Sequence, residues 1–71
     1  MDKTELAKLQ AYLRAKLGNP GFKVVARPRK KDSAEVYIGD EYIGIISRDD
    51  EDGEVSWNFD MAILEVDLDE V

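Results

Sequence analysis

The sequence predicts an α+β fold (αββββ), in which one N-terminal helix packs on a single four-stranded antiparallel sheet. Three observations predict it. Leucines recur at helical spacing near the N-terminus, residues 34–48 alternate apolar and polar side chains around a Gly-Asp pair, and a second alternating stretch occupies residues 54–61. With 71 residues, the chain is expected to form a single domain over positions 1–71.

The composition limits what can hold so small a domain together. The chain has no Cys and no His, which excludes disulfides and removes the usual ligands of zinc and of most transition metals. Carboxylate sites for calcium or magnesium are the metal chemistry that remains. A single core of this size contributes only about 3–5 kcal/mol. We therefore expect no cofactor and no bound metal, and a subunit partner is the expected external support.

A helix is expected from Lys3 to Leu17. Asp2 is its candidate N-cap, and Glu5 follows three residues later at the spacing of a capping box. Leucines at positions 6, 9, 13 and 17 form one apolar stripe, which is expected to cover the core. Gly18 and Pro20 mark the end of the helix, because glycine suits the left-handed C′ position and proline cannot continue a helix.

The first strand is expected at residues 22–27, where FKVVAR alternates. Pro28 ends this strand or places it at an edge of the sheet. The following stretch, RPRKKDS, is expected to be a loop whose cations form a candidate anion-binding site: Arg27, Arg29, Lys30 and Lys31. No aromatic residue is interleaved with these cations, so bases have no platform to stack on. A solvated charged loop is the alternative interpretation.

A β-hairpin is expected next, with strands near 34–39 and 42–48. Gly39 and Asp40 form its two-residue loop, because hairpin turns of this length require a positive φ that glycine adopts freely. The loop position sets the register of the two strands.

This register predicts which side chains face the helix. Val36 is expected opposite Ile43, and Ala34 opposite Ile45, so that the apolar residues of both strands share one face. The intervening residues of both strands then face the other side of the sheet.

The second sheet face is the candidate partner-binding surface. Tyr37 and Tyr42 are expected to lie opposite each other there, with Val25 and Ile46 on the same side. Such a face is too apolar to be left wholly in water, and the predicted helix already covers the first face. Two explanations remain open. The acidic residues 62–71 fold back across this face, or a second copy of the chain covers it in a two-fold contact.

The acidic stretch RDDEDGE, which starts at Arg48, resembles a calcium loop only in part. With Gly53 at the sixth position of an EF-hand loop, Asp50 and Asp52 fit the third and fifth positions. Arg48 and Phe59 then fall at the first and twelfth positions, where anchoring carboxylates are required. We expect a solvated hairpin connection that binds no metal.

A fourth strand is expected at residues 54–61, where apolar and polar side chains alternate. Trp57 and Phe59 are expected to be buried against the helix, because an aromatic stripe in so small a domain usually supplies core area. After Met61 the alternation changes phase, which predicts a bulge or a turn into a short extra segment.

Charge is divided unevenly along the chain. Residues 1–31 contain nine Lys or Arg and two Asp or Glu, whereas residues 32–71 contain one Arg and fourteen acids. Such a division indicates either a charged contact surface or attraction between the basic helix and the acidic sheet within one molecule. We favour the second explanation, since both parts lie within one or two Debye lengths of about 8 Å.

Three stretches together are familiar: LGNPGFKV from Leu17, RPRKKDSAEVYIGDEYIG from Arg27, and RDDEDGEVSWNFDMAIL from Arg48. They resemble a small alphaproteobacterial family of unknown function, domain of unknown function 3126. The resemblance covers essentially the whole chain, and its central AEVYIGDEYIG block is specific. It implies a bacterial cytosolic protein of about this size, with no catalytic or binding residues to carry over.

We expect no enzymatic activity. The hydroxyl nucleophiles are Thr4, Ser33, Ser47 and Ser56, and none of them has a convincing base without His or Cys. Paired carboxylates need a desolvated pocket to act as acid and base, whereas nearly all the acids here fall in loops or at outward strand positions.

The leading hypothesis is a small protein-interaction module that forms a homodimer or binds another protein through its apolar sheet face. The alternative is a nucleic-acid or phosphate-binding module that uses residues 27–31, although fourteen downstream acids disfavour nucleic acid. No stretch approaches the roughly 18–20 apolar residues that span a bilayer, and MDKTELAK lacks the apolar segment of a signal peptide. We expect a cytoplasmic protein without membrane contact.

Overall fold

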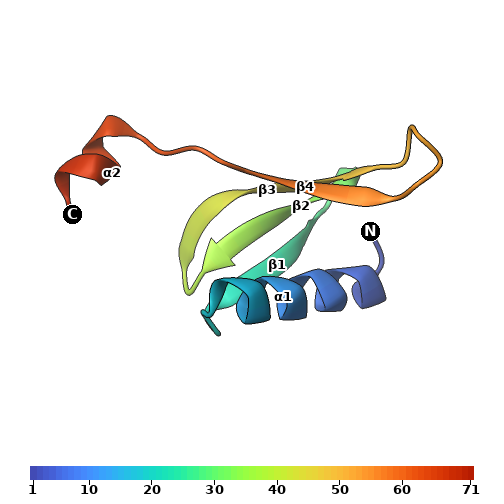
Figure 1. Ribbon diagram of the computed structural model, residues 1–71, viewed down its shortest axis with the longest axis horizontal. Helices are drawn as coiled ribbons and strands as arrows, with labels where there is room; N and C mark the ends of the chain where they lie inside the picture. Colours follow the sequence, from blue (N-terminus) through green and yellow to red (C-terminus); the bar gives the residue numbers. More distant parts are fainter.

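The computed structural model describes residues 1–71 and contains two helices and one sheet (Figure 1). In chain order these are α1 (Lys3–Leu17), β1 (Phe22–Arg27), β2 (Lys30–Ile38), β3 (Glu41–Asp49), β4 (Ser56–Met61) and α2 (Glu65–Asp69). All neighbouring strands are antiparallel and follow the order β1-β2-β3-β4. The predicted α+β class, its N-terminal helix and its four-stranded antiparallel sheet are confirmed.

Both ends of α1 are as the sequence predicts. The Asp2 side chain accepts a hydrogen bond from the Glu5 N–H over 2.8 Å, which satisfies one of the free amides of the first turn. Gly18 ends the helix in the left-handed conformation with φ 64°, and its N–H donates to the Arg14 carbonyl. The helix therefore spans the residues that its capping signals delimit.

The buried core is small and lies between α1 and the β1–β2 half of the sheet. Its six members are Leu13, Phe22, Val24, Ala34, Val36 and Ile46. Partly buried side chains pack around them: Met1, Leu6, Leu9, Ile38, Ile43 and Phe59. The main contact of α1 is with β1, so β4, the opposite edge of the sheet, receives little cover from the helix (Figure 1).

The predicted hairpin register is wrong beyond the first two pairs. Tyr37 lies opposite Tyr42 as expected, but the register then shifts, and Gly44 rather than Ile43 lies opposite Val36. Ala34 consequently pairs with Ile46 instead of Ile45. Ile43 is the extra residue of a β-bulge, which moves every later side chain of β3 to the other face.

Close packing of β4 explains why a glycine occupies the position opposite Val36. A Cβ built on Gly44 would collide with the Asp60 carbonyl oxygen and lie 2.8 Å from Phe59 Cε1. No larger residue fits this position without a shift of the backbone, so the bulge at Ile43 brings a glycine to a place where β4 lies very close to β3.

The basic stretch after β1 is a tight turn and not the seven-residue loop that the sequence suggested. Arg27 pairs with Lys30 across the two turn residues Pro28 and Arg29, so β2 begins at Lys30 and not near residue 34. The register shifts between Ala26 and Arg27, where β2 carries the additional residues of a second bulge.

Residues 62–71, here called the C-terminal arm, project from the end of β4 away from the sheet (Figure 1). The phase change after Met61 corresponds to this exit and to α2, at whose start Asp67 Oδ2 accepts a hydrogen bond from the Leu64 N–H over 2.9 Å. All ten residues of the arm are exposed. The arm therefore does not fold back across the second sheet face, as one of the two explanations required.

Deleting residues 63–71 is expected to leave the monomer folded, because none of these side chains belongs to the core. The free energy of unfolding should change by less than about 0.5 kcal/mol, the usual range for exposed positions. Urea denaturation at low protein concentration, followed by far-UV circular dichroism, measures this change. A large loss of stability would mean that the arm packs on the sheet in solution.

Candidate interaction surfaces

No three or more Asp or Glu side chains converge to hold a metal ion, and the acidic residues between Asp49 and Glu54 are exposed. Neither helix is long and apolar enough to cross a membrane. The surfaces described below are candidate contact surfaces.

The second sheet face carries three of the four predicted partner-binding residues. Tyr37 and Tyr42 stack edge to face, with ring centroids 5.7 Å apart and an interplanar angle of 73°. Val25 lies on the same face, opposite Glu35. Its apolar members are Val25, Tyr37, Tyr42 and Ile45, which together are called the tyrosine face.

Ile46 does not belong to the tyrosine face. Its side chain is only 2% exposed and packs in the core beneath α1, because the bulge at Ile43 turns Ile45 outward in its place. The prediction that Ile46 contributes to a contact surface is therefore corrected to Ile45.

Polar groups interrupt the tyrosine face more than the sequence suggested. Lys23 lies opposite Tyr37, and Ile45 lies between Glu35 and Asp60 on the adjacent strands. The Tyr37 hydroxyl donates a hydrogen bond to Glu35 Oε1 over 3.1 Å, and this bond raises the pKa of Tyr37 above its ordinary value. The tyrosine face therefore combines apolar and charged side chains, and the Tyr37 hydroxyl already has a hydrogen-bond partner within the sheet.

A groove of about 520 Å³ separates α1 from β4. Its walls are mostly apolar: Leu9, Tyr12 and Leu13 from α1, Ile46 from β3, and Trp57 and Phe59 from β4, with Glu5 and Lys8 at the rim. Phe59 packs against the core as predicted. Trp57 was also expected to be core, but 38% of it is exposed, since α1 lies over β1 and stops short of β4.

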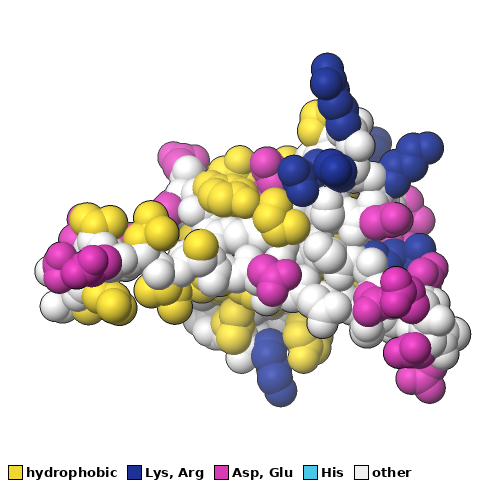
Figure 2. Space-filling view, turned by 90° about the horizontal axis from the view of Figure 1, so that it is seen from above, with side chains coloured by type: hydrophobic (Ala, Val, Ile, Leu, Met, Phe, Trp, Pro, Cys, Tyr) yellow, Lys and Arg dark blue, Asp and Glu magenta, His cyan; other side chains and the backbone are white.

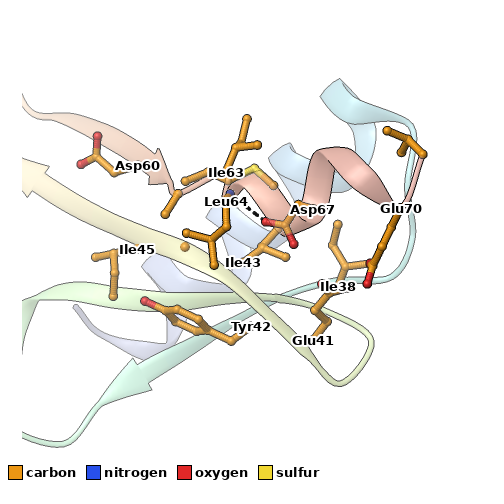
Figure 3. Close-up of a pocket in the computed structure, with 14 residues that line it drawn as sticks. Ile38, Glu41, Tyr42, Ile43, Ile45, Asp60, Ile63, Leu64, Asp67 and Glu70 are labelled. Atoms are coloured by element: carbon orange, nitrogen blue, oxygen red, sulfur yellow. Dashed lines mark hydrogen bonds between the residues drawn. The ribbon is translucent and has the colours of Figure 1, made fainter.

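A second, open groove of about 900 Å³ lies where the C-terminal arm leaves the sheet. Figure 3 shows Tyr42, Ile43 and Ile45 on one side of it, and Ile63, Leu64 and Asp67 of the arm on the other. The groove has nine hydrophobic residues among the fourteen that line it. One wall of this groove is the C-terminal arm, so a molecule that packs against the arm would also close the groove.

Exposed apolar side chains are concentrated at the C-terminal end of the chain. Twelve large hydrophobic residues are exposed, and eight of them follow Glu54: Val55, Trp57, Met61, Ile63, Leu64, Val66, Leu68 and Val71. The space-filling view shows apolar side chains gathered over the projecting arm and the adjacent end of the sheet (Figure 2). This concentration is called the C-terminal apolar surface.

The sequence reasoning missed the C-terminal apolar surface. Cover of the tyrosine face by residues 62–71, including Leu64, Val66 and Leu68, was one of the two explanations left open, although the change of phase after Met61 already separates these residues from the strand pattern.

The predicted anion-binding residues gather at the β1–β2 turn and line neither of the two grooves described above. Arg27 donates to the Ser33 hydroxyl over 3.2 Å, and the N-terminal ammonium donates to the Lys31 carbonyl. Arg29, Lys30 and Lys31 are exposed. Basic and acidic side chains lie together at the end of the molecule opposite α2 (Figure 2), which reduces the positive field available to an anion.

A family model matches this chain. The family model described as "Protein of unknown function (DUF3126)" matches residues 5–67, which is most of the chain. No curated protein and no solved structure matches the chain. The family description gives no activity, so function has to be argued from the surfaces above.

Proposed function

The chain belongs to the DUF3126 family, and we propose that it is a small non-enzymatic protein-interaction module that binds protein through its C-terminal apolar surface. A cytoplasmic location is part of this proposal. The observation that carries it is the distribution of apolar area, with only six hydrophobic side chains buried and twelve large ones exposed. Apolar patches of this kind on a small protein usually mark contact sites.

The size of the core supports the proposal. Only six hydrophobic side chains are buried in this domain of 71 residues, so the free energy of unfolding is expected to be small. A protein partner that covers Trp57 and the C-terminal arm would stabilise the folded state by mass action. The tyrosine face is a secondary candidate contact, because Tyr42 is 51% exposed but the same face also carries Lys23 and Glu35.

Affinity purification of the tagged chain from its native cell, followed by mass spectrometry, tests the proposal. The double variant Leu64→Lys, Leu68→Lys places charges on the arm and is expected to lose the captured proteins. Leu17→Lys is the matched control, because Leu17 is 53% exposed but lies at the end of α1. Proteins captured equally by the wild type and the double variant would contradict the proposed surface.

Nucleic-acid or phosphate binding through Arg27, Arg29, Lys30 and Lys31 is the alternative function, and these residues line neither of the two grooves. We expect affinity for duplex DNA or RNA no tighter than about 1 µM at physiological salt, the range of non-specific contacts. A salt titration of binding, measured by fluorescence anisotropy, checks this. Tighter binding that is lost when Arg29, Lys30 and Lys31 become Ala would reverse the ranking of the two functions.

A further inference from the structure

The two edges of the sheet differ in how their backbone groups are satisfied. At the β1 edge, the Val24 N–H donates to Gln10 Oε1 over 3.1 Å, and Arg14 Nε donates to the Phe22 carbonyl over 2.8 Å. Both side chains come from α1, which lies beside this edge. The helix therefore caps the outward backbone groups of β1, and Pro28 ends the strand.

The β4 edge has no such protection. No hydrogen bond from a side chain or from backbone outside the sheet reaches any residue between Ser56 and Met61. The strand contains no Lys, Arg or Pro, and its single charged residue is Asp60, which lies opposite Ile45 on the tyrosine face. Its outward N–H and C=O groups can accept another strand, and its side chains Trp57 and Met61 are 38% and 52% exposed.

We propose that the partner at this edge is a second copy of the chain. The two β4 strands pair antiparallel across a two-fold axis and join both sheets into one. This inference rests on the proposed function, since it names the occupant of the β4 part of the C-terminal apolar surface. A two-fold contact uses the same surface on both copies, so each β4 side chain has to be compatible with the β4 side chain that lies opposite it in the other copy.

The charges of β4 permit this pairing in two registers. With the axis at Asn58, Trp57 lies opposite the partner's Phe59, and Asp60 lies opposite the partner's Ser56. With the axis at Phe59, Trp57 lies opposite the partner's Met61, and Asp60 lies opposite the partner's Asn58. Both registers align apolar side chains on the helix side and leave Asp60 beside a neutral polar group.

The neighbouring registers are excluded by repulsion. An axis at Asp60 places two carboxylates directly opposite each other, and an axis at Trp57 places Asp60 opposite the partner's Glu54. The chain carries a net charge of −6, so self-association needs a contact free of acidic pairs. The stretch from Val55 to Phe59 is uncharged and lies between acidic segments, which makes β4 the suitable place.

The C-terminal arm adds area to the contact. A stable interface buries about 1,000 Å² or more, which a six-residue strand edge does not supply by itself. The arm continues from β4 in the same direction (Figure 1), so in an antiparallel pair its uncharged start, Ala62 to Leu64, passes the partner's Val55 and Glu54. The acidic part of the arm, from Glu65 onward, has to diverge from the partner's acidic β3–β4 connection. Ile63 and Leu64, which are 65% and 59% exposed, then extend the apolar contact beyond the strands.

Asn58→Asp tests the inference in either register. The new carboxylate faces its own copy when the axis is at Asn58, and it faces the partner's Asp60 when the axis is at Phe59. The dissociation constant of the dimer should rise by about tenfold, because like charges directly opposite each other are destabilising. Asn58 is exposed, and far-UV circular dichroism verifies that the variant is folded. Ala26→Asp, an exposed position on the capped edge strand β1, adds the same charge and should leave the dimer unchanged.

Sedimentation equilibrium of the full chain gives the dissociation constants, and amide hydrogen exchange provides a second measurement. The outward-facing amides of residues 56–61, which do not bond to β3, should become protected as the wild-type concentration rises through the dimer range, whereas the amides of β1 should not. A wild type that stays monomeric at high micromolar concentration overturns the inference. A dimer that is unaffected by Asn58→Asp overturns it too, and its disruption by Tyr42→Lys would assign the contact to the tyrosine face.

Failure of this inference is distinguishable from failure of the proposed function. A monomeric wild type that still captures proteins through the arm removes the β4 dimer and retains the interaction module. A dimer that depends on Asn58, together with equal capture by the wild type and the Leu64→Lys, Leu68→Lys variant, retains the β4 contact and rejects the arm as a binding site for other proteins.

Discussion

Replacing Ile46 with Ala is expected to lower the free energy of unfolding by about 2–5 kcal/mol, the range for truncating a buried isoleucine. The side chain is 2% exposed and packs with Leu13 and Val36 in a core of only six residues. A loss of this size is comparable to the whole stability of so small a domain. The variant should therefore be largely unfolded at low protein concentration.

Ile45→Ala is the matched control for Ile46→Ala. It removes the same atoms one position earlier, but Ile45 lies on the tyrosine face between Glu35 and Asp60 and is only half-buried. We expect a loss of about 1 kcal/mol, near the average for point substitutions. Urea denaturation followed by Trp57 fluorescence measures both variants. Equal losses, or the reverse order, would contradict the bulge at Ile43.

Gly44→Ala is expected to be the most damaging single-methyl change in the chain. The added Cβ would collide with the Asp60 carbonyl oxygen and would lie 2.8 Å from Phe59 Cε1. Because backbone atoms have to move, β3 and β4 must separate. The free energy of unfolding should therefore fall by about 3 kcal/mol or more, the upper end of the usual cost of overpacking. The β3–β4 pairing should weaken first.

Gly53→Ala separates this steric effect from backbone strain. Gly53 has φ 81°, and nothing lies within 4 Å of a Cβ built there. Its replacement should cost about 1–2 kcal/mol, the penalty of the left-handed conformation for a residue with a Cβ. Amide exchange across β4 should accelerate in Gly44→Ala and not in Gly53→Ala. A Gly44→Ala variant as stable as the wild type would mean that the two strands are farther apart than described.

Local signals determined most of the secondary structure. The helix begins after Asp2, whose side chain caps the first turn, and it ends at Gly18, whose backbone adopts the left-handed conformation. The Gly39-Asp40 turn likewise specifies its closing pairs, Ile38 with Glu41 and Tyr37 with Tyr42. These features depend on chain neighbours alone, so the sequence contains all that is needed to predict them.

Tertiary contacts decided the register and therefore the membership of the candidate surfaces. The sequence offers an apolar residue at 43, 45 and 46, and each alternation is consistent with a strand. Only the close approach of β4 at Gly44 selects the register with a bulge at Ile43, which buries Ile46 and exposes Ile45. Non-local packing of this kind leaves no signature in the spacing of residues.

The sequence by itself determined the αββββ order, the capped helix and the absence of Cys and His chemistry. Tertiary structure alone decided that α1 lies over β1, that its Gln10 and Arg14 side chains cap that edge, and that β4 with Trp57 is left uncovered. The physical reason is geometric. One helix of fifteen residues covers only part of a four-stranded sheet, and which part it covers depends on contacts between distant segments.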